Sequence, residues 1–211
     1  MNDSKDTSAF WDRVAQRYAR MSLRNPAAYE QTLDLVKAHL RPDFKVLELG
    51  CGTGTTALRL TQFVAQYDAS DYSAAMIAIA REKQTAERVH NLALHVARSG
   101  NGSLPRGPFD VVLGFNILHL LPDRQLAFAE VFDLLHPGGL FISKTPCLGG
   151  VYRLLSPIVA LLRLFGKAPQ FTFLSADELE RDITNAGFTV RARGAHPEGS
   201  VRHYIIAEKV P

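Results

Sequence analysis

The part of this sequence most able to do chemistry is a glycine-rich segment that directly follows a short apolar run. Residues 46–54 read VLELGCGTG, and their glycines are Gly50, Gly52 and Gly54. Glycine adopts positive φ at little cost, and because it has no Cβ it lets a ligand approach the backbone closely. Open α/β sheets bind ligands at the carboxyl ends of their strands, where a loop of this kind would lie. We therefore expect these glycines to form the floor of a ligand-binding site.

Dinucleotide binding is one interpretation of this loop. The pattern G-x-G-x-x-G, counted from Gly50, fails at Thr55, and counted from Gly52 it ends at Ala57 and survives as a weak match. Glu48, an acid two residues before the first glycine, favours a different ligand. An NAD(P)-dependent oxidoreductase is therefore kept as the alternative function.

Two acids, Asp68 and Asp71, lie at the end of the next expected strand. A carboxylate about 20 residues beyond such a glycine loop can accept hydrogen bonds from both hydroxyls of a ribose. Both acids qualify on spacing alone. The simpler interpretations are a solvated loop carboxylate for Asp68 and a helix-capping acid for Asp71.

The run from Glu48 to Gly54, ELGCGTG, resembles the first motif of the class I S-adenosylmethionine-dependent methyltransferases. The resemblance covers most of the chain, from about Phe10 to Lys209, and Asp71–Met76, DYSAAM, is similar to the family pattern D-x-S-x-x-M. It implies S-adenosyl-L-methionine as the cofactor. In the family, the third glycine of the dinucleotide pattern is unnecessary because there is no pyrophosphate to hold.

The resemblance also implies roles for individual residues. Glu48 would order the loop near the amino acid part of the cofactor, while the glycines and Cys51, whose small size suits close packing, run beneath its methionine and ribose. Asp71 takes the ribose role, which leaves Asp68 without one. Tyr72 would lie against the adenine, and Met76 would begin the helix that lines that side.

At the adenine end the sequence departs from the family pattern. After the third strand the family usually has an acid that accepts a hydrogen bond from the adenine amino group. Residues 97–100 read Ala-Arg-Ser-Gly and contain no acid. Arg98 could stack on the base or use its backbone, and Ser99 could accept a hydrogen bond.

The segment 109–123, FDVVLGFNILHLLPD, resembles the family's fourth strand and the loop that follows it. Asn116 to His119 would then lie beside the cofactor sulfonium and the methyl acceptor. His119 is the candidate general base, because a neutral imidazole titrates near working pH. The competing interpretation is a histidine that packs in the loop and contacts the cofactor without moving a proton.

Two segments outside the strand–helix alternation are candidates for covering the site. Residues 1–41 look like an amphipathic helical cap, and the resemblance makes Tyr18 a contact to the methionine end of the cofactor. Residues 146–173 form an apolar insertion with arginines and a lysine at its margins. Three interpretations of this insertion stay open: a substrate lid, an oligomer contact, or an interfacial helix that touches lipid.

The nature of the acceptor is narrowed mainly by what the sequence lacks. Family members that methylate bases or amides carry Asn- or Asp-Pro-Pro-aromatic after the fourth strand, whereas residues 116–119 read NILH. No basic stripe marks a nucleic-acid surface. We therefore expect a small-molecule or lipid-like acceptor. A non-catalytic regulator that binds S-adenosylmethionine is a further alternative.

The elements that must position these residues follow a regular rhythm. Apolar runs at 45–49, 63–71, 92–97, 109–115 and 140–145 alternate with helical patterns at 55–63, 73–87 and 124–135. A helix at 175–188 and strands at 189–194 and 202–209 complete the pattern. This alternation predicts right-handed βαβ units and a mostly parallel sheet. With the resemblance, it predicts a single domain of doubly wound α/β fold: seven strands, helices on both faces, and an antiparallel last strand at the sheet edge.

Composition bounds the remaining possibilities. At 211 residues with 46% hydrophobic and 21% charged residues, the chain can bury a core without a metal or disulfide. Its net charge of +3 is too small to indicate nucleic acid as a partner. Two cysteines indicate a reducing compartment, no metal-ligand spacing is visible, and the first residues lack a signal-peptide pattern. A cytoplasmic protein is the resulting expectation, with peripheral membrane contact and homo-oligomer formation left open.

Overall fold

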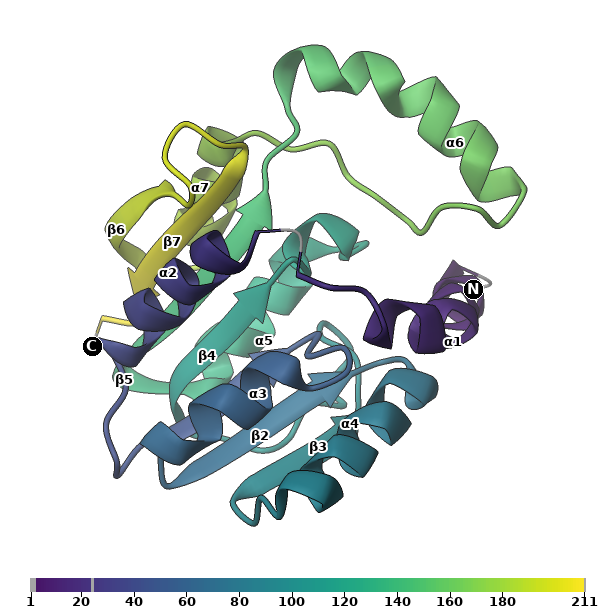
Figure 1. The fold of residues 1–211 in the computed structure, drawn as a ribbon. Helices are drawn as coiled ribbons and strands as arrows, with labels where there is room; N and C mark the ends of the chain where they lie inside the picture. The colour runs from purple at the N-terminus through teal and green to yellow at the C-terminus, as the bar shows by residue number, and fades with distance from the viewer. Residues whose placement is uncertain (1–2, 24, 211) are drawn as a thin grey trace.

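One seven-stranded sheet organises the molecule, a computed structural model that describes residues 3–23 and 25–210. Residues 1, 2 and 24 of the expected cap, and residue 211, lie outside the described part. The strand order is β3-β2-β1-β4-β5-β7-β6, with helices on both faces (Figure 1). Strands β1 to β5 are parallel, and β7 is antiparallel to both of its neighbours. The predicted fold class is confirmed.

The strands account for the apolar runs of the sequence. They are β1 Lys45–Leu49, β2 Gln66–Asp71, β3 Leu92–Val96, β4 Phe109–Phe115, β5 Leu135–Pro146, β6 Thr189–Ala195 and β7 Arg202–Glu208. Between them lie the helices α3 Thr55–Leu60, α4 Ala74–Glu87, α5 Arg124–Leu134 and α7 Ala176–Asn185, with short 3-10 turns η1 Thr61–Phe63 and η2 Leu118–Leu120. Ser73 caps α4 as its sequence indicates, because its Oγ accepts a hydrogen bond from the N–H of Met76 at 3.2 Å.

The core has two layers because the central strands are buried on both faces. On one face, Val46 and Val111 pack against α2 and α3; on the other, Leu47 and Phe141 pack against α5 and α7. Strands covered on both sides read as continuous apolar runs, which is why they are visible in the sequence. The carboxyl ends of β1, β2 and β4 meet at one end of this sheet, where the site lies.

The last strand is antiparallel as expected, but its expected position at the sheet edge is wrong. Strand β7 lies between β5 and β6, and β6 is the edge. Edge and interior are distinguished by burial: Ile205, Ile206 and Ala207 are buried, whereas β6 has no buried residue. The run HYIIA already contained this signal, since an interior strand is expected to be more apolar than an edge strand.

Residues 136–139 lie within the bounds of β5 but interrupt its pairing with β4. Leu135 pairs with Phe109 and Leu140 with Val111, so these four residues fall outside the register. Gly138 has a φ of 82°, its N–H donates to the Lys209 carbonyl at 2.6 Å, and Lys209 N–H donates to the Gly139 carbonyl at 3.0 Å. The two glycines therefore form an irregular stretch of the strand that is bonded to the end of the chain.

Helices α1 Asp3–Ala19 and α2 Pro26–Lys37 precede the sheet, but they take different places. Helix α2 packs on the sheet, whereas α1 lies near the carboxyl ends of the strands and contacts α4 (Figure 1). Asp12 fixes α1 there, because its Oδ1 accepts from Ser73 Oγ at 2.6 Å and from Ala75 N–H at 3.1 Å. The 3-10 turn η3 Gly150–Leu155 and helix α6 Ser156–Leu164 project from the molecule beyond α1 (Figure 1).

Candidate functional site

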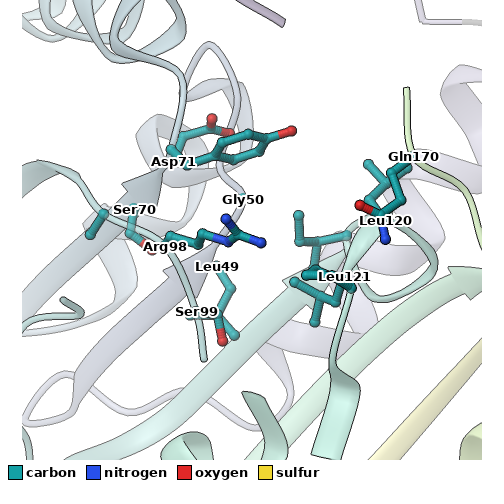
Figure 2. Close-up of a pocket in the computed structure, with 13 residues that line it drawn as sticks. Leu49, Gly50, Ser70, Asp71, Arg98, Ser99, Leu120, Leu121 and Gln170 are labelled. Carbon is teal, nitrogen blue, oxygen red and sulfur yellow. The ribbon is translucent and has the colours of Figure 1, made fainter. Parts of the chain in front are cut away.

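A cleft with an empty volume of about 490 Å³, partly open to solvent, lies at the carboxyl ends of β1, β2 and β4. One wall carries polar residues from the ends of β2 and β3, and the opposite wall carries Leu120 and Leu121 from the segment after β4, with Gln170 beside them (Figure 2). The lining residues are Leu49, Gly50, Ser70, Asp71, Tyr72, Ala97, Arg98, Ser99, Ile117, Leu120, Leu121, Pro122 and Gln170. The glycine loop and the β2 acid predicted from the sequence therefore meet in one place.

The three glycines of the loop have positive φ, but for different reasons. A Cβ on Gly50 would come within 2.8 Å of the Ile117 side chain, and one on Gly54 within 2.9 Å of Ala80. A Cβ on Gly52 would meet only Tyr18, at 3.8 Å. Protein packing therefore explains two of the glycines. At Gly52 there is room for a Cβ below the Tyr18 ring, so packing within the protein does not require glycine there.

Asp71 ends β2 with its carboxylate at the cleft wall. Its Oδ2 accepts from the N–H of Gly52 and its Oδ1 from the N–H of Ser73, both at 2.9 Å. Burial raises the pKa of Asp71, and these two backbone hydrogen bonds oppose the rise. A carboxylate offers about four lone pairs, so two acceptor positions remain for a ligand hydroxyl pair.

Asp68 is neither a ligand residue of this cleft nor the solvated loop acid that its simpler interpretation suggested. It lies within β2, 4% exposed, and its two oxygens bind His95 Nε2 at 2.6 Å and Gln66 Nε2 at 2.7 Å. The pair links β2 to β3, so Asp68 stabilises the sheet.

Glu48 is buried beneath the loop on the α2–α3 side of the sheet. Its Oε2 accepts from Tyr67 Oη at 2.9 Å, and the side chain is 3% exposed. Burial raises the pKa of Glu48 to about 7, with a smaller contribution in the same direction from Asp71. A buried acid that titrates near neutral pH responds strongly to a nearby cation, such as the ammonium group of an amino acid.

Tyr18, from α1, lies over the glycine loop beside Gly52. Its pKa is raised by burial first and then by the charges of Asp71 and Glu48. Its ring is also in edge contact with Trp11, at 6.2 Å between centroids. The sequence-based role of Tyr18 as a contact above the cofactor therefore has a matching position.

The other residues of the loop and of D-x-S-x-x-M take separate places. Tyr72 lines the cleft, but Met76 is buried between α1 and α4, beside Ala15. The Cys51 side chain is likewise buried in the core, and burial raises its thiol pKa well above the usual value. Cys51 therefore contributes backbone to the loop, and its side chain serves packing.

At the adenine end, Arg98 and Ser99 both line the cleft, and the Arg98 side chain extends toward Leu120 and Leu121 (Figure 2). Ser103 Oγ accepts the N–H of Arg98 at 2.9 Å and donates to its carbonyl at 3.1 Å, which fixes this loop. Ser99 Oγ is buried without a hydrogen-bond partner in the described part of the chain. Such an atom is available to a ligand.

Asn116 and His119 follow β4 but face different surroundings. Asn116 is exposed, with a φ of 55°, and its N–H donates to the Lys144 carbonyl at 2.8 Å. His119 is 8% exposed and packs on Phe171, with 5.0 Å between ring centroids. Burial lowers the pKa of His119 to about 4, and within residues 3–23 and 25–210 its Nδ1 has no partner. The ring is therefore neutral near pH 7.

The insertion 146–173 reaches the cleft through the segment that returns from α6 toward the sheet, whose individual residues the sequence did not single out. Gln170 lines the cleft, and the N–H of Thr172 donates to the His119 carbonyl at 2.8 Å. Phe171 also contacts Phe173, at 5.0 Å between centroids. The run QFTF gave a detectable signal, since two aromatic residues one apart in an irregular segment need a surface to pack on.

Lys144 is a second residue without a sequence-based role. It is 7% exposed on β5, and its Nζ donates to Thr32 Oγ1 and, at 3.2 Å, to the carbonyl of Ala28. Burial lowers the pKa of Lys144 to about 8. These bonds attach α2 to the sheet and direct the ammonium group to α2.

Two further observations concern metal binding and membrane-spanning helices. Within the described ranges, no group of three His, Cys, Asp or Glu side chains is placed to hold a metal ion. No helix among the same residues is long and apolar enough to cross a membrane.

Comparison with known proteins identifies the family. Residues 46–139 match the family model described as a methyltransferase domain. The highly reducing polyketide synthase NEC1 of Pyricularia oryzae is 31% identical over 188 residues, which is 82% of this chain and 6% of that protein. The highly reducing polyketide synthase lcsB of Purpureocillium lilacinum is 26% identical over 79% of this chain. The chain thus spans only 7% or less of the length of these two curated relatives.

Solved structures show the same fold. A protein of Thermotoga maritima, titled a SAM-dependent methyltransferase, "possible histamine N-methyltransferase", superposes with a TM-score of 0.72 at 22% identity, covering 96% of this chain and 99% of that one. Geranyl diphosphate C-methyltransferase of Streptomyces coelicolor A3(2) superposes with a TM-score of 0.71 at 14% identity, covering 86% and 79%.

Proposed function

This chain belongs to the class I S-adenosylmethionine-dependent methyltransferases, and we propose that it methylates a lipophilic small molecule bound against the apolar wall of the cleft. Bound S-adenosylmethionine supplies a methyl group that its sulfonium already activates for in-line displacement. The protein's task is then to position the acceptor and exclude water.

The polar wall of the cleft fits this cofactor. Asp71 presents a carboxylate with free acceptor positions where the ribose hydroxyls would lie, and the loop at Gly52 would run beneath the methionine part. Glu48 would respond to the ammonium group, Tyr18 would cover it, and Ser99 Oγ would bind at the adenine end in place of the family's acid. The Asp71 carboxylate, held at the cleft wall by the N–H groups of Gly52 and Ser73, is the observation that carries the proposal.

The acceptor would occupy the other side of the cleft. Ile117, Leu120 and Leu121 form an apolar wall there. His119 comes from the same segment, outside the cleft lining, with its ring against Phe171. Apolar lining favours a ligand with a hydrocarbon part. Two relatives support this class by name: a polyketide synthase, and a geranyl diphosphate C-methyltransferase whose structure contains geranyl diphosphate.

His119 is the proposed proton acceptor, within limits set by its surroundings. Its ring is neutral, and the unpartnered Nδ1 can accept a hydrogen bond from the acceptor's O–H or C–H group. A pKa near 4 makes it a weak base, so it would remove a proton only from an acidic group, such as a phenol or a carbon between two carbonyls. On this proposal, simple alcohols would react poorly.

Methyl transfer tests the function directly. Titration calorimetry should show S-adenosylhomocysteine binding, and labelled methyl transfer should be detected on a panel of phenols and β-dicarbonyl compounds with alkyl chains. His119→Gln should reduce turnover by about tenfold or more without changing cofactor affinity. His136→Gln, an exposed histidine on β5, is the matched control and should behave like the wild type.

The outcomes separate the alternatives kept from the sequence. Binding of S-adenosylhomocysteine without any methylated product across the panel would favour the non-catalytic regulator. Binding of a nicotinamide cofactor instead would return the oxidoreductase alternative. If His119→Gln retained full turnover, the histidine would be a packing residue.

A further inference from the structure

The arm formed by η3 and α6, residues 150–165, is apolar and exposed. No residue of either element is buried, and Val151, Leu154, Leu164 and Phe165 are 76%, 80%, 83% and 69% exposed. Isolated exposed apolar residues are common, but contiguous ones of this size mark an interaction surface. The arm stands apart from the sheet on the side of α1 (Figure 1).

The charges along the arm all have one sign. No Asp or Glu occurs between Asp133 and Asp177, whereas Arg153, Arg163 and Lys167 flank or lie within the arm. Arg153 pairs with Glu178 at the base of the arm. Residues 151–167 are exposed throughout except at Val159, so the cations of this stretch lie at the surface with the apolar side chains.

Helix α6 has apolar side chains around most of its circumference. At 3.6 residues per turn, only Ser156 and Arg163 share a narrow polar stripe. A groove on a protein partner would cover one side of such a helix and leave the others in water. At a bilayer surface the apolar sides enter the hydrocarbon boundary, while the stripe of Ser156 and Arg163 faces the headgroups.

We propose that the arm docks on an anionic lipid surface. The apolar side chains of η3 and α6 would enter the boundary between headgroups and acyl chains, and the basic residues would contact acidic headgroups. With only nine residues, α6 is too short to span the bilayer, so the contact is peripheral.

Two other interpretations of the arm fit less well: a contact between two copies of the chain, and a lid over the cleft. A symmetric contact between two copies of the arm would bring like charges together, since residues 134–176 contain no acid and Glu178, at the base of the arm, is already paired with Arg153. A lid over the cleft would need α6 residues in the cleft lining, but the insertion contributes Gln170 from the segment after α6. Arg13 Nη2 donates to the Gly166 carbonyl at 2.6 Å, which joins the end of the arm to α1.

Vesicle flotation tests the proposal with the whole chain and no cofactor or acceptor, so its result is independent of methyl transfer. The chain should float with vesicles of phosphatidylcholine mixed with phosphatidylglycerol. Its affinity for these vesicles should be about tenfold or more higher than for vesicles of phosphatidylcholine alone. High salt should weaken the anionic binding. Leu154→Ser combined with Leu164→Ser should reduce binding by about tenfold or more.

A matched control removes exposed apolar side chains elsewhere. Val96 and Leu126 are 52% and 57% exposed on β3 and α5, and their double serine variant should bind vesicles like the wild type. Circular dichroism checks that both double variants fold. Equal binding losses in the two variants, or no flotation of the wild type, would overturn the proposal. So would concentration-dependent dimers that the arm variant abolishes while vesicles leave the wild type unbound.

Discussion

The two walls of the cleft differ in what holds their side chains in place. At the polar wall, which we propose binds the cofactor, two acids have partners within the protein. Asp71 accepts from backbone N–H groups, and Glu48, beneath the loop, accepts from Tyr67. On the acceptor side, the His119 Nδ1 is buried without a described partner, and the nearby arm has apolar side chains without cover.

This difference indicates that the two walls depend on ligands to different degrees. Groups already bonded to the backbone are pre-organised, so a ligand finds them in place. A buried polar atom without a partner costs free energy that a ligand can recover by bonding to it. Apart from Ser99 Oγ, the wall proposed to bind the cofactor is therefore set by the fold, whereas the side proposed to bind the acceptor would be completed by its ligand.

The largest expected effect tests the electrostatics of the cofactor wall. Because folding raises the Glu48 pKa from about 4.5 to about 7, the folded protein retains a proton that the unfolded chain loses between these values. The contribution of Glu48 to stability is therefore fully present below pH 4.5 and is lost, by about 3 kcal/mol, as pH rises through 7. Burial lowers the pKa of His119, so that ring adds stability over an overlapping pH range. Urea unfolding from pH 5 to 8 should therefore show the loss as the difference between the wild type and Glu48→Gln.

The same variant sharpens the proposed contact with the cofactor ammonium. A cation favours the charged carboxylate, so cofactor affinity should increase as pH rises through 7 in the wild type. In Glu48→Gln that increase should disappear. An unchanged pH dependence would place the ammonium group away from Glu48.

The ribose assignment gives the next largest effect. Asp71→Ala removes the carboxylate from the cleft wall and should weaken S-adenosylhomocysteine binding by about 1.5–3 kcal/mol, or roughly 10- to 150-fold. Asp68→Asn is the matched change on the same strand; it should lower stability, because the bond to His95 weakens, and leave affinity unaltered. The reverse pattern, measured by titration calorimetry, would refute the assignment to Asp71.

The fold and the cofactor wall were predictable because their signals are local. Glycines after an apolar strand predict a loop, and an acid at the end of the next strand predicts a carboxylate beside that loop. Neither prediction depends on residues far away in the sequence. The expected adenine acid was absent from the sequence, and Ser99 has no partner at that place in the structure. The departure in the sequence thus marks the part of the wall that the protein alone leaves incomplete.

The remaining features depend on contacts between distant residues. The burial of Asp68 depends on His95, the packing of His119 on Phe171, and the position of β7 between β5 and β6 on how the last two strands pair. No local pattern specifies such partners. The signals that existed, an apolar last strand and an aromatic pair at the end of the insertion, indicate burial without specifying the partner.

A smaller effect tests whether position 52 is glycine because a ligand needs the space or only because its backbone has a positive φ. Gly52 and Gly199 have φ of 53° and 71°, and at neither would a Cβ meet an atom closer than 3.8 Å. Each alanine variant should lose about 1 kcal/mol of stability, the cost of a left-handed conformation with a Cβ. Only Gly52→Ala should also weaken S-adenosylhomocysteine binding, by about tenfold, since its methyl group enters the cofactor space. Equal affinity in both variants would mean that the cofactor does not lie above Gly52.

The smallest effect concerns the bond between α1 and the end of the arm. Arg13→Met removes the exposed hydrogen bond to the Gly166 carbonyl, whose loss should scarcely change stability. The segment 167–173 follows directly and carries Gln170 to the cleft, so the acceptor's KM should increase by roughly two- to threefold with kcat unchanged. Arg17→Met, one turn further along α1, makes the same change in charge and should leave KM at the wild-type value. If both variants shifted KM equally, the effect would come from net charge. If Arg13→Met instead altered cofactor affinity, the Arg13–Gly166 bond would support the wall proposed to bind the cofactor. The two walls would then not depend on their ligands as differently as we infer.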